Sequence, residues 1–388
     1  MNILHTIPYL GKAQGGPVES LRLLASAQAD RDHRVRIVYT GVEGDGESIR
    51  FPENVQTVHA SSFTSNRWSP KLINSALSDG FVPEVVHSHG LWLDVSRQSA
   101  KLSEQLGIPH IISPCGMLQR DAVKRSKWKK RIAWFVFQKK ILLTAEIIHA
   151  KSEAEASEIR KLFPEAKVKV VPNPIQTPPK NIIDDNTSDR KLRLNKDLFH
   201  QNEIFPEHKI LLFMGRVHPV KGLEHLLKAW TGIYEKFPDW RLVIMGPDEG
   251  GFRSKLKSMI RNNSSNVVFA DPVFGEKRWA AYANADLFIA PSVFENFGQS
   301  IAEALATGVP VITTTGTPWK DLKEKKCGWW IDPKPESIAD ALKEALALSD
   351  SERKAKGEAG KSIVEQFLPI IIAEKMCELY SNCAKKLN

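Results

Sequence analysis

The chain has 388 residues, which at roughly 150 residues per domain predicts two or three domains and excludes a single small module. Hydrophobic residues make up 42% and charged residues 26%, which excludes broad disorder, and the four scattered cysteines exclude a disulfide framework or a zinc knuckle. Lys and Arg outnumber Asp and Glu by 54 to 45, and the net charge of +9 favours anionic partners.

The beginning of the sequence gives an expectation for the compartment. Residues 1–7 lack the basic and apolar regions of a signal peptide, and no window of 18 residues is both uncharged and apolar. We therefore expect a reduced, cytoplasmic setting.

Short β-branched runs alternate with helical patterns through the first half of the chain. The spacing of apolar residues predicts an amphipathic helix over 18–29. The expected strands are 2–7, 35–39, 55–58, 85–89, 110–113, 147–150 and 168–171. Because these strands are almost continuously apolar and helices separate them, we predict a parallel sheet covered on both faces.

A polar stretch with several prolines, 174–208, separates the two halves and contains one short helical pattern at 191–199. Its composition is typical of a connection between domains. The second half repeats the rhythm, with a helix at 223–237 and strands at 209–214, 241–245, 266–270, 287–290 and 309–313.

This pattern predicts an α/β protein of two doubly wound domains, 1–178 and 209–364, joined by a linker at 179–208. A last helix is expected within 365–388. Ligands of such folds bind at the carboxyl ends of the strands, which here predicts a cleft between the domains.

Two adjacent glycines, Gly15 and Gly16, follow the first expected strand. Such a pair lets backbone amides approach a phosphate at the start of the next helix. The spacing matches neither the dinucleotide pattern G-x-G-x-x-G nor a P-loop, and a tight turn also explains the pair. The residues alone leave both interpretations open.

His87 and His89 end the expected strand 85–89. Alternation along a strand places both side chains on one face, at the rim of the expected cleft. A metal site needs a third ligand, and the neighbouring sequence offers none. Hydrogen bonding to a polar substrate and a structural role both remain open.

Arg216 and Lys221 lie in a loop bounded by Gly215 and Gly222, between a strand and a helix. Arginine can bind a phosphate through two hydrogen bonds and lysine adds a point charge, so the pair suits a diphosphate. Two solvated loop cations are the alternative.

Two glutamates eight residues apart follow the strand 287–290, with Glu295 in a loop and Glu303 in a helix that Gly298 introduces. Eight helical steps would separate them by about 12 Å along the axis, too far for both to act on one atom. A nucleotide sugar has about this length, so one carboxylate suits the sugar and the other the ribose. The backbone amides of 297–300 suit its phosphates.

These motifs, in this order, resemble those of the retaining glycosyltransferases of family 4, whose GT-B fold has two Rossmann-like domains facing a central cleft. The resemblance covers nearly the whole chain, and it implies that the C-terminal helix, 365–388, packs back on the first domain. It rests on Gly15-Gly16, the His-x-His strand end, Val171-Pro172-Asn173-Pro174, Gly215-Arg216-x4-Lys221-Gly222, Glu295-x7-Glu303 and Gly308-Val309-Pro310-Val311-Ile312.

Within that family, two further segments are similar to the bacterial branch that builds exopolysaccharide, capsule or lipopolysaccharide. They are Ser113-Pro114-Cys115-Gly116-Met117-Leu118, followed by a basic aromatic stretch, and Thr317-Pro318-Trp319 with Gly328-Trp329-Trp330. The resemblance implies transfer of a sugar from a nucleoside-diphosphate sugar to a glycan acceptor.

The resemblance also implies roles for individual residues. Arg216 and Lys221 would hold the donor diphosphate, with the Gly15-Gly16 turn reaching it from the other domain. Glu303 would bind the ribose hydroxyls, and His89 would face the donor sugar near the reacting carbon. The donor sugar would meet Glu295 and the segment Asn296, Phe297, Gly298 and Gln299. The implied catalytic residues are His89, Arg216, Lys221 and Glu295.

One residue departs from the pattern of this branch. Cys115 stands where related sequences often have a larger polar or basic residue, which affects the expected acceptor contacts.

The sequence contains no Asp-x-Asp pair at a strand end that would carry a divalent metal, so we expect no metal and no other cofactor. Cationic side chains and amides would then stabilise the leaving nucleoside diphosphate. Because no residue stands out as a covalent nucleophile, we expect a same-face displacement that retains the anomeric configuration.

The stretch 120–140 carries nine basic residues and one acid, with Trp128, Trp134, Phe135 and Phe137 among them. This composition suits an amphipathic helix on an anionic leaflet, and a solvated basic face over buried aromatics is the alternative. Membrane contact would suit a lipid-linked acceptor and a peripheral place on the inner face of the cell membrane. No nucleic-acid-binding motif accompanies the charge, so we expect no nucleic-acid partner.

Two other functions share this architecture. A GT-B sugar-nucleotide epimerase would bind the same donor without an acceptor, and the spacing of Glu295 and Glu303 argues against it. A non-enzymatic nucleotide-sugar-binding protein would bind the donor without turnover.

Overall fold

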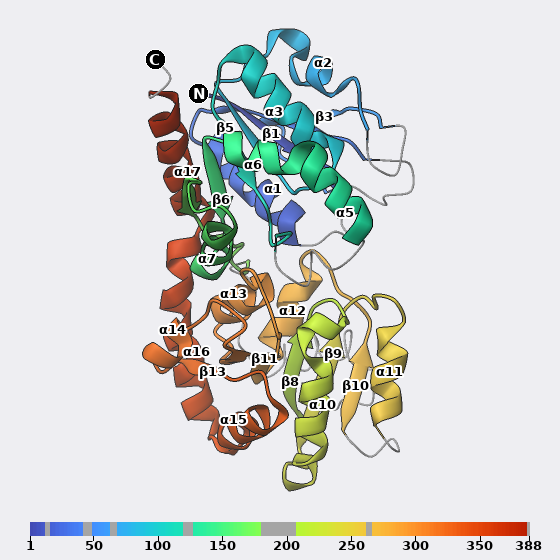
Figure 1. Ribbon diagram of the computed structural model, residues 1–388. Helices are drawn as coiled ribbons and strands as arrows, with labels where there is room; N and C mark the ends of the chain where they lie inside the picture. Colours follow the sequence, from blue (N-terminus) through green and yellow to red (C-terminus); the bar gives the residue numbers. More distant parts are fainter. Residues whose placement is uncertain are drawn as a thin grey trace. The chain divides into compact units, whose positions relative to one another are not determined.

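A computed structural model describes residues 1–11, 16–41, 49–62, 68–118, 127–179, 207–260 and 266–385 (Figure 1). The chain forms two compact units, Met1–Pro174 with Phe367–Asn388, and Ile175–Gln366. Each unit contains one doubly wound parallel sheet, which confirms the predicted α/β class. The helical pattern at 191–199 and most of the expected linker lie outside the described residues. In the described part of the chain, no helix is both long and apolar enough to cross a bilayer.

The first unit is built on a seven-stranded parallel sheet in the order β3-β2-β1-β4-β5-β6-β7. Its strands are β1 (Asn2–Ile7), β2 (Arg34–Tyr39), β3 (Val55–His59), β4 (Val85–His89), β5 (His110–Ser113), β6 (Ile147–Ala150) and β7 (Val168–Val170). Its helices are α1 (Gly16–Ala29), α2 (Leu72–Ala76), α3 (Asp94–Leu106), α5 (Lys127–Ala133), α6 (Lys139–Thr144), α7 (Glu153–Leu162) and α17 (Pro369–Ala384), with a 3-10 turn η2 (Ser78–Gly80) and a π-helical turn η3 (Trp134–Gln138). All seven predicted strands are present.

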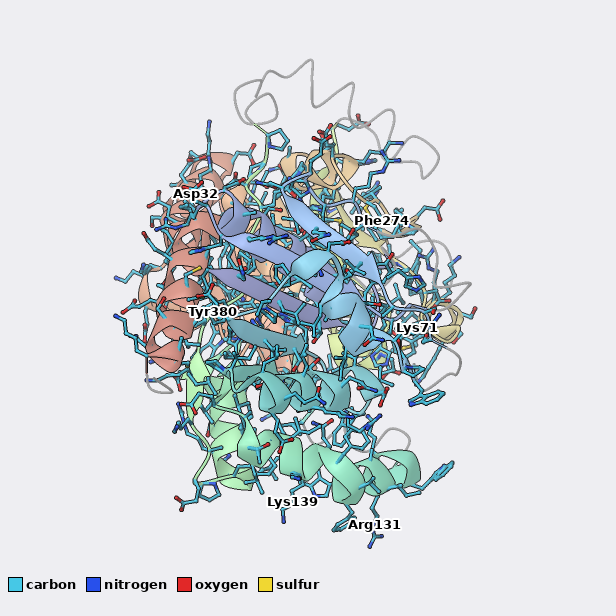
Figure 2. All side chains as sticks on the ribbon, turned by 90° about the horizontal axis from the view of Figure 1, so that it is seen from above. Asp32, Lys71, Arg131, Lys139, Phe274 and Tyr380 are labelled. Atoms are coloured by element: carbon cyan, nitrogen blue, oxygen red, sulfur yellow. The ribbon has the colours of Figure 1, made fainter. Side chains whose placement is uncertain are left out.

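Helices cover both faces of this sheet because its strands alternate their apolar side chains between two cores. One core joins Ile3 and Ile7 of β1 to α1 and α17. The other face packs against α2 and α3 through Leu4 and Val86, and against α6 and α7 through Ile112 and Ile148. Figure 2 shows Tyr380 where α17 meets the sheet. The last helix of the chain is therefore part of the first unit.

The second unit is built on a six-stranded parallel sheet in the order β10-β9-β8-β11-β12-β13. Its strands are β8 (Lys209–Met214), β9 (Trp240–Met245), β10 (Val267–Ala270), β11 (Leu287–Ala290), β12 (Val311–Thr314) and β13 (Gly328–Ile331). Its helices are α10 (Leu223–Thr231), α11 (Phe252–Met259), α12 (Lys277–Ala283), α13 (Gln299–Ala306), α14 (Asp321–Glu324), α15 (Pro335–Ala347) and α16 (Asp350–Val364), with 3-10 turns η5 (Pro219–Lys221), η6 (Tyr234–Lys236) and η7 (Glu365–Phe367) at its end.

Both sheets have the Rossmann strand order, in which the sequence runs outward from a central strand in one direction and then in the other. The order reverses between β1 and β4 in the first unit and between β8 and β11 in the second. Such switch points, at the carboxyl ends of the strands, are where doubly wound sheets bind ligands.

Several details differ from the sequence prediction. The first unit ends at Pro174 rather than at 178, because Ile175 is fully buried and Gln176 accepts a hydrogen bond from Arg278 within the second unit. The helix predicted over 223–237 ends at Thr231, where Gly232 caps it, and a 3-10 turn follows. The strand β13 was not predicted.

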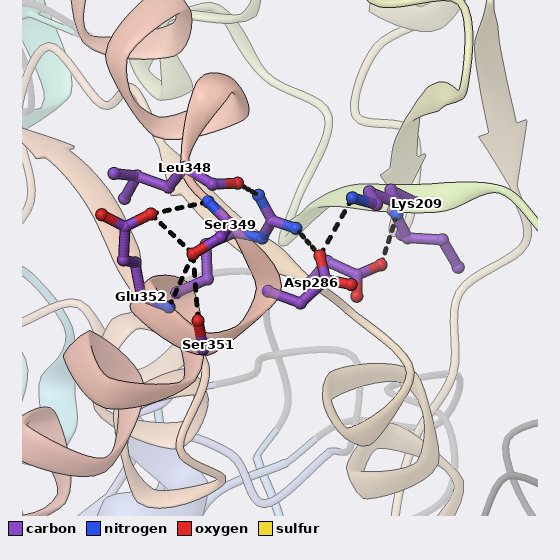
Figure 3. A network of polar contacts seen from close by, with 9 residues as sticks. Lys209, Asp286, Leu348, Ser349, Ser351 and Glu352 are labelled. Carbon is purple, nitrogen blue, oxygen red and sulfur yellow. Dashed lines mark hydrogen bonds and ion pairs between the residues drawn. The ribbon is translucent and has the colours of Figure 1, made fainter.

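At the amino end of α16, a network of polar contacts fixes the helix to the second sheet (Figure 3). Ser349 and Glu352 form a reciprocal capping box, with the Ser349 amide 2.8 Å from the Glu352 carboxylate. Asp350 pairs with Arg353 and, at 2.9 Å, with Lys209, the first residue of β8. Lys209 is at the amino end of β8, whereas the switch-point loops follow the carboxyl ends of the strands. The network therefore lies at the opposite end of the sheet from these loops, and we assign it a structural role.

Candidate active site

The loops that follow β8 and β11 are fixed to each other at the switch point of the second sheet. Gly222 has a φ of +70°, and a Cβ there would lie 1.9 Å from the carbonyl oxygen of Pro291. The amide of Val293 donates to the carbonyl of Val220 at 2.9 Å. Only glycine permits this approach, which explains the Gly that ends the Arg216 to Gly222 motif.

The ion pair of Lys221 with Glu295 joins the same two loops through their side chains. Both side chains are largely buried, with 16% and 22% of their surface exposed. The sequence placed these residues at one site with separate roles, and the structure shows them in direct contact.

Arg216 is 52% exposed and pairs with Glu249, which follows β9. Sequence reasoning missed Glu249. The sequence does show an acidic residue shortly after the strand β9. Its contact with Arg216 could be predicted only by knowing that β9 lies next to β8 in the sheet.

The segment 296–299 is held from the loop after β12. The indole Nε1 of Trp319 donates to the Phe297 carbonyl at 2.5 Å, and the two rings pack with centroids 5.5 Å apart. Gly298 has a φ of +85°, and a Cβ there would lie 2.8 Å from Ile301 Cδ1. The buried side-chain oxygen of Asn296 has no hydrogen-bond partner among the described residues, so a hydroxyl donor would satisfy it.

Gln299 is the first residue of α13, as the sequence predicted. The first amides of a helix have no intrahelical acceptor, and the helix dipole favours an anion there. The loop therefore presents amides next to the Lys221 cation.

Glu303 lies inside α13 and is 7% exposed, which confirms the expected burial of this helix. Its carboxylate accepts a hydrogen bond from the Tyr282 hydroxyl at 2.9 Å and pairs with Arg278 at 3.4 Å. Burial and the adjacent carboxylate raise the pKa of Tyr282 well above its usual value. The Tyr282 hydroxyl and the Arg278 guanidinium therefore fix the position of this carboxylate inside α13.

In the first unit, His87 and His89 share one face of β4, as predicted, with ring centroids 4.2 Å apart. Both rings are buried. The Nδ1 of His5, on the neighbouring strand β1, lies 3.1 Å from His89 Nε2. His5 is directly opposite His87 in the strand register. The sequence missed His5 because only the pairing of β1 with β4 brings it there.

Hydrogen-bond partners assign the tautomers of two of these imidazoles. Because a carbonyl oxygen can only accept, His149 Nε2, which lies 2.8 Å from the Val171 carbonyl, carries the proton. His149 Nδ1 then accepts from His87 Nε2 at 3.2 Å. His87 Nδ1 in turn accepts from the Tyr380 hydroxyl at 2.6 Å. The helix α17 thus fixes the ring of His87.

The same logic fixes His89. His5 Nε2 donates to the side-chain oxygen of Gln28 at 2.8 Å, so His5 Nδ1 accepts from His89 Nε2. His89 Nδ1 is then a hydrogen-bond acceptor. Burial lowers the pKa of His5 to about 4 and lowers the pKa of His89 well below its usual value, so both rings are neutral near pH 7.

Lys151 places a buried ammonium group beside this cluster, 3.4 Å from a nitrogen of His149. Burial lowers the pKa of Lys151 and raises the pKa of Cys115, which interact electrostatically. Glu155 accepts from the amides of Lys151 and Gly116 at 2.7 and 2.6 Å. Lys151 therefore places a positive charge near enough to Cys115 to act on its thiol.

His5, His87 and His89 also offer nitrogens within 4.8 Å of one another, an arrangement that can hold a metal ion. His5 is therefore the third candidate ligand, which the sequence around His87 and His89 did not supply. The rings are already engaged by Gln28 and Tyr380, and the Lys151 charge opposes a further cation.

Of the two loop glycines, Gly15 lies outside the described residues. Gly16 is the first residue of α1, after β1 at the switch point of the first sheet. No described atom lies within 4 Å of a Cβ built on Gly16.

Two family models match the chain. Glycosyl transferases group 1 matches residues 195–362, and Glycosyl transferase 4-like domain matches 15–174.

Three curated relatives are glycosyltransferases by name. An uncharacterised glycosyltransferase of Methanocaldococcus jannaschii is 30% identical over 235 residues, 59% of this chain and 58% of that protein. D-inositol 3-phosphate glycosyltransferase of Corynebacterium urealyticum is 25% identical over 316 residues, 78% of this chain and 72% of the relative. Phosphatidyl-myo-inositol mannosyltransferase of Mycobacterium leprae is 31% identical over 182 residues, which are 45% of this chain and 47% of that protein. The matches to the first and third span less than two thirds of those proteins.

Solved structures share the fold over 98% of the chain. Sucrose-phosphate synthase of Thermosynechococcus elongatus has a TM-score of 0.76 at 19% identity and is covered over 99% of its length. Anabaena HepE, solved with UDP and glucose, has a TM-score of 0.74 at 17% identity. WaaG, a glycosyltransferase involved in lipopolysaccharide biosynthesis, has a TM-score of 0.69 at 16% identity. Both matches cover 100% of the solved chain.

The two doubly wound sheets and the solved structures of the same fold define a two-domain α/β protein with the GT-B architecture. Within that class, the chain belongs to the group 1 glycosyltransferases.

Proposed function

We propose that this glycosyltransferase retains the anomeric configuration of its donor, works without a metal ion, and passes the sugar to a glycan acceptor in the assembly of a bacterial surface polysaccharide. The observation that carries the donor part is the contact of Lys221 with Glu295 at the switch point of the second sheet, beside the amino end of α13. A cation, a carboxylate and helix amides at such a place suit a diphosphate linked to a sugar.

In the proposed reaction, the bond between the anomeric carbon and the leaving phosphate oxygen breaks, and a bond to the acceptor oxygen forms on the same face. The acceptor hydroxyl proton passes to the leaving phosphate. Arg216, Lys221 and the first amides of α13 stabilise the developing negative charge, and Glu303 holds the ribose.

His89 contributes from the first unit. Its neutral ring is held by His5, and its Nδ1 accepts a hydrogen bond from a hydroxyl of the donor sugar. Gly16 approaches the diphosphate through its backbone.

The proposal for the acceptor rests on the sequence resemblance and on the functions given in the names of similar proteins. WaaG is described as a glycosyltransferase involved in lipopolysaccharide biosynthesis, which agrees with a glycan acceptor. We propose that this acceptor is lipid-linked and reached from the cytoplasmic side. A second candidate is a phosphorylated polyol. The relative named for D-inositol 3-phosphate and the buried Lys151 ammonium in the first unit favour it.

A panel of nucleotide sugars tests the donor. The matching donor at about 100 times its Kd should stabilise the folded protein by about 2.7 kcal/mol and raise its Tm by several degrees. Lys221→Ala should abolish the rise, and Lys236→Ala, an exposed lysine of the same unit, should keep it. If no nucleotide sugar raises the Tm of the wild type, the proposal is wrong.

Proton NMR of the product then tests the stereochemistry, with glycan and polyol phosphate acceptors compared side by side. An α-linked donor should give an α-linked product. An inverted product would contradict the mechanism but leave donor binding intact.

A further inference from the structure

The helical segment 127–144 of the first unit, formed by α5, η3 and α6, has a face of large exposed apolar side chains. The exposed fractions range from 52% to 73% for Trp128, Ile132, Phe135, Val136 and Leu143. Single exposed apolar residues are ordinary, but five on one short helical segment form an apolar patch of the kind that marks an interaction site.

The π-helical turn η3 keeps this patch on one face. Leu142 follows Trp128 by 14 residues, about four turns of an α-helix, and would share its exposed face in a regular helix. The π turn adds about one residue, which rotates the following residues around the axis. Leu142 is fully buried as a result, and Lys139, Lys140 and Leu143 are exposed instead.

The opposite face of the segment is anchored to the first unit. Trp134 packs against Phe163 with ring centroids 5.5 Å apart, and Ile141 and Leu142 are part of the same core. The side-chain oxygen of the buried Gln138 accepts from the Trp92 amide at 2.7 Å. The orientation of the segment is therefore fixed, and its apolar outer face does not belong to the core of the unit.

The outer face is also cationic. Arg131, Lys139 and Lys140 are exposed beside the apolar patch, and the sequence 127–144 contains no acidic residue. Figure 2 shows Arg131 and Lys139 on the outer edge of the segment, pointing away from the sheet.

We propose that this face, defined by Trp128, Arg131, Ile132, Phe135, Val136, Lys139, Lys140 and Leu143, docks on an anionic lipid bilayer. Aromatic and aliphatic side chains enter the boundary between headgroups and acyl chains, and the cations meet the lipid phosphates. A second copy of the chain is a poorer occupant, because it would bring the same positive charge to the contact. The inference does not depend on the proposed acceptor.

Vesicle sedimentation of the full chain tests the proposal. The wild type should sediment with vesicles containing about 30% phosphatidylglycerol and remain in solution with phosphatidylcholine alone. A triple variant that removes the cations, Arg131→Gln, Lys139→Gln and Lys140→Gln, should have a partition coefficient onto the anionic vesicles about a hundredfold lower than the wild type. Replacing the apolar residues, in Phe135→Ser with Val136→Ser, should lower it by about tenfold or more.

Matched controls carry the same substitutions on the second unit. Phe274→Ser removes an exposed aromatic ring, and Lys228→Gln with Lys236→Gln and Lys354→Gln removes three exposed cations. These variants should bind vesicles like the wild type.

A second measurement needs no variant: hydrogen exchange of 127–144 should slow on anionic vesicles. Equal binding by all variants, or no protection of the segment, would overturn the proposal. A loss of self-association in the apolar variant, without an effect on vesicles, would instead assign the face to a second copy.

Discussion

The ammonium of Lys221 and the carboxylate of Glu295 form one ion pair, although 74 residues separate them in the sequence. They meet because β8 and β11 are neighbours at the switch point, so the loops that follow them share an edge of the sheet. The residue expected to hold the diphosphate is thus positioned by the residue expected to meet the sugar.

This pairing predicts non-additive kinetics. Lys221→Ala should lower kcat by 10² to 10³ fold, roughly the effect of removing one preorganised electrostatic contact. Because Glu295 acts partly through Lys221, the double variant Lys221→Ala with Glu295→Gln should be little worse than Lys221→Ala alone. Independent roles would instead give effects that multiply, which steady-state kinetics of the three variants would show.

Gly298→Ala should weaken donor binding. A side chain at φ +85° is strained, and its Cβ would press on Ile301 and on Trp319 Nε1, 3.1 Å away. The loop must shift, so we expect a KM for the donor raised by about tenfold and a loss of about 1–3 kcal/mol in stability. Gly250→Ala is the control, because it also has a positive φ but no described atom within 4 Å of its Cβ. Equal donor KM values in the two variants would contradict the role of the loop.

The buried histidines predict a pH-dependent first unit. The pKa of His5 and that of His110 are each lowered from 6.5 to about 4 by burial, so between these values the unfolded chain binds more protons than the folded one. The free energy of unfolding should therefore fall as the pH drops from about 6.5 to about 4 and stay level above about 7, with His5 alone contributing about 3 kcal/mol. Hydrogen exchange of β1 and β4, corrected for the intrinsic rate and compared with β8 and β9, measures this. A flat profile would show that the rings are solvated.

The metal expectation has its own test. The close imidazoles of His5, His87 and His89 could hold zinc, whereas the proposed transfer needs none. We expect purified protein to contain no stoichiometric metal by elemental analysis, and EDTA to leave turnover unchanged. Stoichiometric zinc that is lost in His5→Gln would reassign the cluster as a metal site.

Ser349→Ala should lower the stability of the protein without changing its activity. It removes the capping box of α16, at a cost of about 1 kcal/mol in the free energy of unfolding. Because this network lies at the amino end of β8, donor affinity and kcat should not change. Urea unfolding and steady-state kinetics check the two halves of the prediction.

Local patterns predicted the strands well, because a parallel strand buried on both faces is a continuous apolar run. In β8, for example, Ile210, Leu211, Leu212 and Phe213 are at most 2% exposed. The strand β13 was not predicted, because its strand character comes from its pairing with β12.

Site residues that belong to a local motif could be predicted from the sequence. Site residues that meet only because of the strand order were missed. Gly298 and Glu303 could be placed on a loop and a helix from their neighbours alone. His5 beside His89, and Glu249 beside Arg216, depend on which strands are adjacent, which one sequence does not state. The π turn that buries Leu142 also has no local signal in 134–138.

The return of α17 to the first unit has a consequence for biosynthesis. Residues 1–174 emerge early from the ribosome, but the core on the His87 face of their sheet also contains residues of α17, and Tyr380 of that helix contacts His87. The second unit is one continuous stretch and can complete its core before the first. Synthesis therefore runs from amino to carboxyl end while completion of the two cores runs in the reverse order, and nascent chains shorter than about 370 residues should expose the apolar side of the first sheet to chaperones.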